Sequence, residues 1–188
     1  TWASVSDSDL HSCGVTTAGE AYCWGWNHNG QLGNDMTTAF RANPEPSLVS
    51  GGYTWTSVSG GGLGHTCGVT TAGEAYCWGY NYYGQRGDGT TADSSVPVLV
   101  SGGHTWTSVT GRHSHTCGVT LFNEAYCWGK NAYGQIGDGT TGGGTWTWAP
   151  KHDPTLVIGG HTWASVTNGS DHTCGLTTAG VAYCWGQN

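Results

Sequence analysis

The chain has 188 residues, 12 of them acidic and 5 basic, with a formal net charge of −7. The scattered basic residues argue against a nucleic-acid-binding surface, and no apolar run is long enough to cross a bilayer. Charged residues make up only 9%, whereas Gly numbers 34, Trp 11 and Tyr 9. This composition is typical of a turn-rich all-β protein with a core of Trp, Tyr and Val.

Four repeats account for the chain, and each begins with a Trp-x-Ser-Val segment that we expect to form a strand. These segments start at Trp2, Trp55, Trp106 and Trp163, so the steps between them are 53, 51 and 57 residues. A period near 50 residues, with several short strands in each repeat, is typical of β-propeller blades. We therefore predict about four blades of four antiparallel strands each.

Each Trp segment is followed by a predicted hairpin that carries two cysteines 10 positions apart. In the second repeat, pairing Cys67 with Cys77 leaves residues 71–73 as the loop, with Gly73 at the position that requires positive φ. The third repeat has Asn123 at that position. Asn is the next-best residue there, so the exchange supports this hairpin register.

This register places the two cysteines of each hairpin directly opposite each other, within reach of a disulfide. The even count of 8 cysteines and their repeated spacing favour disulfides over buried thiols. The spacing is too long for a zinc knuckle. Disulfides place a chain outside the reducing cytosol, and with no signal peptide before Thr1 we expect a mature secreted or cell-surface chain, or an excerpt of one. The predicted pairs are Cys13–Cys23, Cys67–Cys77, Cys117–Cys127 and Cys174–Cys184.

A Gly-rich loop with the pattern Asn-x-x-Gly-Gln-x-Gly follows each of the first three hairpins, and a Pro-led apolar strand and a Gly-Gly turn come next. We assign each Pro-led strand to the start of the following blade, so the first unit lacks this strand. The predicted units are 1–50, 51–101, 102–158 and 159–188. The third unit contains a surface-loop insertion at 142–151, and the fourth stops before its next connection.

These segments resemble the repeat of the regulator of chromosome condensation family across essentially the whole chain. The matching pattern is His-x-Cys-Gly-Val-Thr, then Ala-Tyr-Cys-Trp-Gly-x-Asn-x-x-Gly-Gln-x-Gly, then the Pro-led strand. The chain is most similar to exported, disulfide-containing bacterial variants of this repeat. The resemblance implies a seven-bladed propeller that serves as a binding platform. A ring of seven such blades needs about twice this chain, and a shared fold does not transfer nucleotide exchange to it.

A histidine stands two positions before the first cysteine of every hairpin. Four imidazoles in a ring could bind a metal ion. A feature of every repeat is more often part of the fold, so we expect these side chains to satisfy polar groups between blades. We predict no cofactor and no metal. The four residues are His11, His65, His115 and His172.

Aromatic residues in loops or at variable repeat positions are better candidates for binding, because such side chains anchor protein partners or stack on sugars. The alternative is packing beneath long loops. The candidates are Trp26, Tyr80, Tyr82, Tyr83, Tyr133, Trp146 and Trp148. Separately, Asn168 begins an Asn-Gly-Ser sequon and is a candidate glycosylation site.

No nucleophile elbow, phosphate-binding loop or pair of non-repeated carboxylates appears, so we expect no enzyme. The favoured function is an extracellular, non-enzymatic binding or scaffolding module that contacts a protein partner. Two alternatives stay open. One is a structural subunit of a surface layer or filament, assembled head to tail from copies of the chain. The other is a lectin-like propeller that binds glycans.

Overall fold

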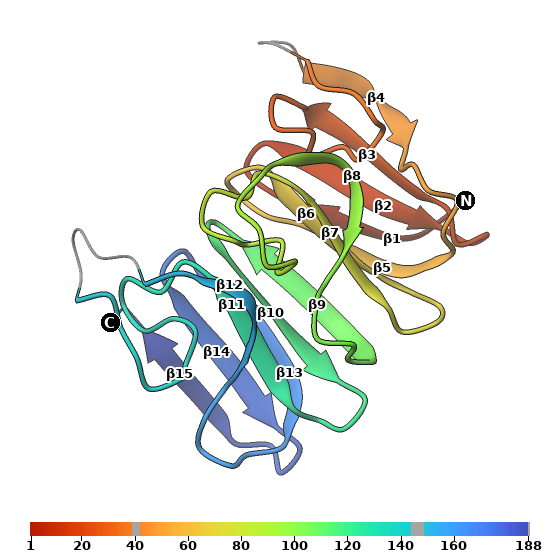
Figure 1. Ribbon diagram of the computed structural model, residues 1–188. Coiled ribbons are helices and arrows are strands. Elements are labelled where there is room, and N and C mark those ends of the chain that lie inside the picture. Colours follow the sequence, from red (N-terminus) through yellow and green to blue (C-terminus); the bar gives the residue numbers. More distant parts are fainter. Residues whose placement is uncertain (39–41, 144–148, 188) are drawn as a thin grey trace.

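The computed structural model describes residues 1–38, 42–143 and 149–187. These residues form 15 strands and no helix, arranged as four antiparallel sheets that follow one another along the chain (Figure 1). Within these ranges there is consequently no helix that could cross a membrane. The fold is all-β, and each sheet is one propeller blade, as the sequence predicts.

The strands of each blade pair in the order in which they occur in the sequence. Blade 1 contains β1 (Trp2–Asp7), β2 (His11–Thr16), β3 (Ala21–Trp26) and β4 (Ala42–Leu48). Blade 2 contains β5 (Trp55–Gly60), β6 (His65–Thr70), β7 (Ala75–Gly79) and β8 (Ser94–Leu99). Blade 3 contains β9 (Trp106–Arg112), β10 (His115–Thr120), β11 (Ala125–Gly129) and β12 (Lys151–Leu156). Blade 4 contains β13 (Trp163–Asn168), β14 (His172–Thr177) and β15 (Ala182–Gly186).

The Pro-led strands β4, β8 and β12 close the blade of the preceding hairpin. In blade 2, for example, Tyr76 of β7 lies opposite Leu99 of β8. The prediction that this strand opens the next blade was wrong: blade 1 is complete, and blade 4 has three strands among the described residues. Proline has no N–H to donate, so it suits the outer edge of a sheet. The predicted limits 1–50, 51–101 and 102–158 nevertheless each enclose one four-stranded blade.

The hairpins have the predicted register, with Cys67 opposite Cys77 and Val69 opposite Ala75 in blade 2. Positive φ occurs where the loop requires it, at Gly73 (79°) and at Asn123 (61°). Disulfides join the four predicted cysteine pairs, each with a Cα–Cα distance of 4.1 Å. Every cysteine of blades 1 to 3 is fully buried.

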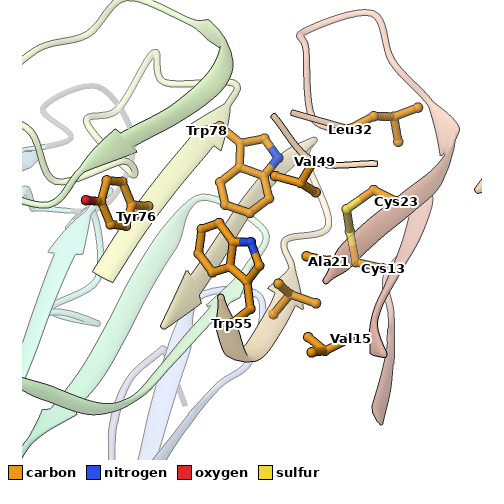
Figure 2. Close-up of a cluster of buried hydrophobic side chains, with 10 residues drawn as sticks. Cys13, Val15, Ala21, Cys23, Leu32, Val49, Trp55, Tyr76 and Trp78 are labelled. Atoms are coloured by element: carbon orange, nitrogen blue, oxygen red, sulfur yellow. A yellow bond between two sulfur atoms is a disulfide. The ribbon is translucent and has the colours of Figure 1, made fainter. Parts of the chain in front are cut away.

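The hydrophobic cores lie between successive blades. In the first of them, the Cys13–Cys23 disulfide and Val15 of blade 1 face the indole rings of Trp55 and Trp78 of blade 2 (Figure 2). The same contact recurs between blades 2 and 3 and between blades 3 and 4. Because each blade buries one face against the next, the packing fixes the loops of neighbouring blades relative to one another.

The two ends of each blade differ. The hairpin turn lies at one end, and the Gly-rich loop leaves the third strand at the other. The turn between the first two strands opens at this second end as well, because β6 begins at His65, opposite the last residue of β7, Gly79. We call this second end the loop face. It carries the variable residues of the Gly-rich loops.

Candidate functional site

The repeated histidines connect each blade to the next. The Nε2 atoms of His11, His65 and His115 lie 2.7, 3.0 and 2.9 Å from threonine hydroxyls of the following blade. Thr116, the partner of His65, donates its hydroxyl hydrogen to the backbone oxygen of Gln85 at 2.7 Å. The hydroxyl must therefore accept from the imidazole, so Nε2 of His65 carries the proton.

The same glutamine oxygens also accept a hydrogen bond from a tryptophan of the following blade. Trp78 Nε1 donates to Gln31 O, Trp128 Nε1 to Gln85 O and Trp185 Nε1 to Gln135 O, at 2.9 to 3.0 Å. We call this set of histidine, threonine, glutamine and tryptophan the blade lock. It occurs at all three junctions between blades, which explains why these residues recur.

The blade lock explains why a histidine recurs at this position of the repeat, and this explanation needs no metal ion. Burial lowers the pKa of His65 and of His115 to about 3, and that of His11 to about 4, so these imidazoles are neutral near pH 7. Their Nε2 atoms are already used as donors. Among the described residues, no three His, Cys, Asp or Glu side chains are grouped to hold a metal ion. His172, in blade 4, is exposed.

Three of the predicted aromatics come together on the loop face of blade 2. The Tyr80 and Tyr82 rings are nearly parallel, with centroids 6.5 Å apart and an interplanar angle of 8°. Tyr83 lies edge-on to Tyr82 at 5.0 Å. The Tyr82 side chain is 60% exposed, which is unusual for a ring of this size beside two others.

Blade 3 places a charged and an aromatic residue on the same loop face. Lys130 Nζ lies 5.6 Å from the centroid of the Tyr133 ring and 3.0 Å from Asp171 Oδ1 of blade 4. Burial raises the pKa of Tyr83, and the charge of Lys130 acts to lower it. We call Tyr80, Tyr82, Tyr83, Lys130 and Tyr133 the tyrosine surface.

Repeated residues hold the backbone beneath the tyrosine surface. The side-chain oxygen of Asn81 accepts from Arg86 N at 2.9 Å, and its amide nitrogen donates to Thr90 O at 2.9 Å. Gln85 Oε1 accepts from Tyr83 N at 2.9 Å. Because Asn81 and Gln85 recur in the other Gly-rich loops, the residues between them can vary without loss of loop shape.

The remaining predicted residues lie elsewhere. Trp26 ends β3 in blade 1 and is partly buried, whereas Trp146 and Trp148 lie outside the described residues. Asn168 is 7% exposed, and its side-chain nitrogen donates to His115 O and Cys117 Sγ, both at 3.4 Å. The atom that a glycan would modify is therefore engaged inside the folded chain, which argues against glycosylation at this sequon.

Comparison with known proteins identifies the repeat. Two models of the regulator of chromosome condensation (RCC1) repeat match the chain, one at residues 2–31, 55–85 and 110–135, the other at residues 18–69, 72–119 and 123–176. The chain belongs to the RCC1 repeat family. The human E3 ubiquitin-protein ligase HERC2 is 33% identical over 94 residues, which cover 49% of this chain and 2% of HERC2.

Several solved structures share the fold. Human WBSCR16 superposes on 100% of this chain with a TM-score of 0.84 at 20% identity, and yeast RCC1 (Prp20), solved bound to Kap60, on 99% with 0.83 at 20% identity. The ectodomain of the Physcomitrella patens receptor kinase CR4 covers 100% with 0.59 at 22% identity. The match extends over 48%, 44% and 39% of these chains, so this chain has part of an RCC1 propeller and spans less than half of each neighbour.

Two residues at or beside the tyrosine surface, Lys130 and Asp171, were not predicted from the sequence. Lys130 occupies the repeat position of Tyr80, directly before the Asn of the Gly-rich loop. Its partner Asp171 lies in the β13–β14 turn of the following blade, 41 positions away. Lys130 could have been noticed in the sequence, because the other repeats have an aromatic or amide residue at this position. The pairing itself depends on how two blades pack.

Proposed function

We propose that this chain is a non-enzymatic protein-binding module that works outside the cytosol and docks its partner on the tyrosine surface. The observation that carries the proposal is the cluster of Tyr80, Tyr82 and Tyr83, with Tyr82 60% exposed on a loop that Asn81 and Gln85 hold in shape. Tyrosine is enriched at protein interfaces, where a rigid ring supplies contact area at low entropic cost.

Two further points support this function. RCC1-type propellers are commonly protein-interaction modules, and the yeast RCC1 neighbour was solved bound to Kap60. The four disulfides favour a non-reducing compartment, and the CR4 neighbour is an ectodomain. The partners of these neighbours are not carried over, because a likeness at 20 to 22% identity describes the fold.

The test uses a phage-displayed random peptide library selected on the full chain. The selected peptides are then assayed against a variant with Tyr80→Ala, Tyr82→Ala and Tyr83→Ala. We expect affinity to fall at least about tenfold, since buried interface aromatics dominate binding energy. Phe122→Ala is the matched control, because Phe122 is 76% exposed in the hairpin turn of blade 3, at the end opposite the loop face. Equal binding to the triple variant would overturn the proposal.

The second candidate is head-to-tail assembly, which the two outermost blade faces favour. Trp2 of blade 1 is 43% exposed, whereas the equivalent Trp55 is 3% exposed. Leu176 of blade 4 is 42% exposed, whereas the equivalent Val69 is 2% exposed. A further blade of this repeat would cover either face, whether it came from the same chain or from another copy. Light scattering at increasing concentration tests assembly from copies, which requires a native mass that is a multiple of the chain mass.

The lectin-like alternative stays a prediction, since its strongest candidates, Trp146 and Trp148, lie outside the described residues. A glycan array probed with the chain and with the triple tyrosine variant tests it directly. Binding of a defined glycan by the chain and not by the variant would replace a protein partner with a sugar on the tyrosine surface.

A further inference from the structure

A hollow beside the tyrosine surface lies at the junction of blades 1 and 2. It has a volume of about 280 Å³ and is lined by His28, Asn29, Thr37, Asp93, Ser94 and Ser95. Hydroxyl and amide groups make up most of this lining. Asp93 supplies its one carboxylate, so the site offers oxygen ligands and a negative charge.

Asp93 is held in place at the edge of the tyrosine surface. Its Oδ1 accepts from Asn81 N at 2.8 Å, and its Oδ2 accepts from the side-chain nitrogen of Asn29 at 3.0 Å. Neither donor is charged, so these hydrogen bonds give the carboxylate no counter-charge, and lone pairs are left for a ligand. Tyr80 directly precedes Asn81, and Asp93 contributes to the raised pKa of Tyr80, after burial and Tyr83.

The charge balance of the chain favours a cation at this place. The chain has 12 acidic and 5 basic residues. Three ion pairs, Arg86 with Asp88, Lys130 with Asp171 and Lys151 with Asp138, each cancel one positive and one negative charge and so leave the net charge at −7. The field of the chain therefore attracts positively charged partners and steers them to the surface.

The tyrosine surface already contains one cation over a ring. Lys130 Nζ lies 5.6 Å from the centroid of Tyr133 and also pairs with Asp171. At the other end of the surface, the Asp93 carboxylate accepts a hydrogen bond from the backbone of Asn81, the residue after Tyr80. A lysine or arginine side chain of a partner could reach this carboxylate while the rest of its segment lies on the neighbouring tyrosines.

We infer that the partner of the proposed function is a basic protein segment, and that one of its lysine or arginine side chains enters the hollow at Asp93, next to the tyrosine surface. The inference rests on the proposed function. It adds the chemistry of the partner and a residue, Asp93, that lies outside the tyrosine surface. An acidic or uncharged segment would leave the Asp93 carboxylate without a counter-charge.

The probes are two fluorescein-labelled peptides of Gly and Ser that differ only in carrying Arg or Glu at the same positions. Fluorescence anisotropy with the full chain should show the arginine peptide binding at least about tenfold more tightly. Asp93→Asn should weaken the arginine peptide by about threefold to tenfold and make its binding less sensitive to salt. Glu20→Gln is the matched control, because it removes the same charge from an exposed hairpin turn at the other end of blade 1. This variant should change affinity less than about twofold.

The outcomes separate the two proposals. If Asp93→Asn and Glu20→Gln weaken the arginine peptide equally, the attraction comes from net charge and the Asp93 site is overturned. The selected peptides could instead lose binding to the triple tyrosine variant, contain no basic residue, and bind the Asp93→Asn variant with unchanged affinity. In that case the proposed function stands and this inference fails. If the triple tyrosine variant binds the selected peptides normally, the proposed function and the inference fail together.

Discussion

The imidazole of His65 in blade 2 donates to the hydroxyl of Thr116 in blade 3 across 3.0 Å, and that hydroxyl donates to the backbone of Gln85 in blade 2. The hydrogen bonds thus run from one blade to the next and back. Both side chains are fully buried. Buried polar groups cost free energy unless they are hydrogen-bonded. Because the partners in the blade lock belong to two blades, each blade packs favourably only when its neighbour is correctly placed.

Removing this imidazole should destabilise the chain. His65→Ala deletes a buried hydrogen bond and leaves a cavity between Gly61 and Gly111, whose backbones lie close to the ring. We expect the free energy of unfolding to fall by about 2 to 4 kcal/mol, measured by urea denaturation. His113→Asn in the neighbouring turn is the control, because Asn keeps the positive φ of 52°. A cost for His65→Ala no greater than the control's would contradict the role of the lock.

Mildly acidic pH should lower the free energy of unfolding of the chain, because of the same histidines. Burial lowers the pKa of His65 and His115 from 6.5 to about 3 and that of His11 to about 4. The unfolded state therefore binds protons that the folded state cannot. Above pH 6.5 the imidazoles are neutral in both states, so they do not lower the free energy of unfolding. As the pH falls from 6.5 toward 3 or 4, protonation of the unfolded state lowers it. From about pH 7 to about pH 5 the loss should be about 2 kcal/mol per histidine.

Urea denaturation at these two pH values measures this loss directly. His65→Gln removes one of the three titrating groups, so its pH-dependent loss should be smaller than that of the wild-type chain by about one third. A free energy of unfolding that does not change between the two pH values would show that these imidazoles are already accessible to protons in the folded chain.

Arg86 provides a separate test of packing. It is 4% exposed between blades, at the repeat position that Leu32 and Ile136 occupy elsewhere, and it pairs with Asp88. Arg86→Leu alone should cost about 1 to 3 kcal/mol, because the Asp88 carboxylate loses its counter-charge.

Arg86→Leu combined with Asp88→Asn recreates the Leu32 and Asn34 combination of blade 1. It should be at least as stable as the wild-type chain, because replacing a buried ion pair by apolar packing is often neutral or stabilising. The comparison is made by thermal and urea unfolding of the wild type and both variants. A double variant less stable than the wild-type chain would show that the ion pair is favourable in itself.

The disulfides should differ in their resistance to reduction. The cystines of blades 1 to 3 are fully buried between blades, whereas Cys184 is exposed and Cys174 partly buried. A thiol reductant must reach a sulfur atom, so Cys174–Cys184 should open first under native conditions. Timed alkylation followed by peptide mass spectrometry measures the order. Equal rates at all four pairs would mean that blade 4 is as well covered as the others.

The sequence predicts well what each repeat determines locally. The exchange of Gly73 for Asn123 identified the hairpin turn, and the cysteine spacing identified the disulfides. Assignment of the Pro-led strand failed because its position just before the next Trp strand suggested the wrong neighbour. The prolines themselves, such as Pro97 in β8, contained the correct signal, because a residue without an N–H belongs on a sheet edge.

The candidate site was predicted only in part. Tyr80, Tyr82 and Tyr83 are close in sequence, so their clustering could be expected. The pairing of Lys130 with Asp171, and the placement of Asp93 next to Asn29, join residues of different blades. Such pairs depend on the angle between blades, which no local pattern encodes.

Hydroxyl-radical footprinting of the full chain, with and without a library-selected peptide, tests directly whether the tyrosine surface docks a partner. If the tyrosine surface is the docking surface, oxidation of Tyr80, Tyr82 and Tyr83 should fall on binding, while oxidation of the exposed Phe122 should not change. Protection of Phe122, with the three tyrosines oxidised as before, would place the binding surface on the hairpin turns and contradict the account.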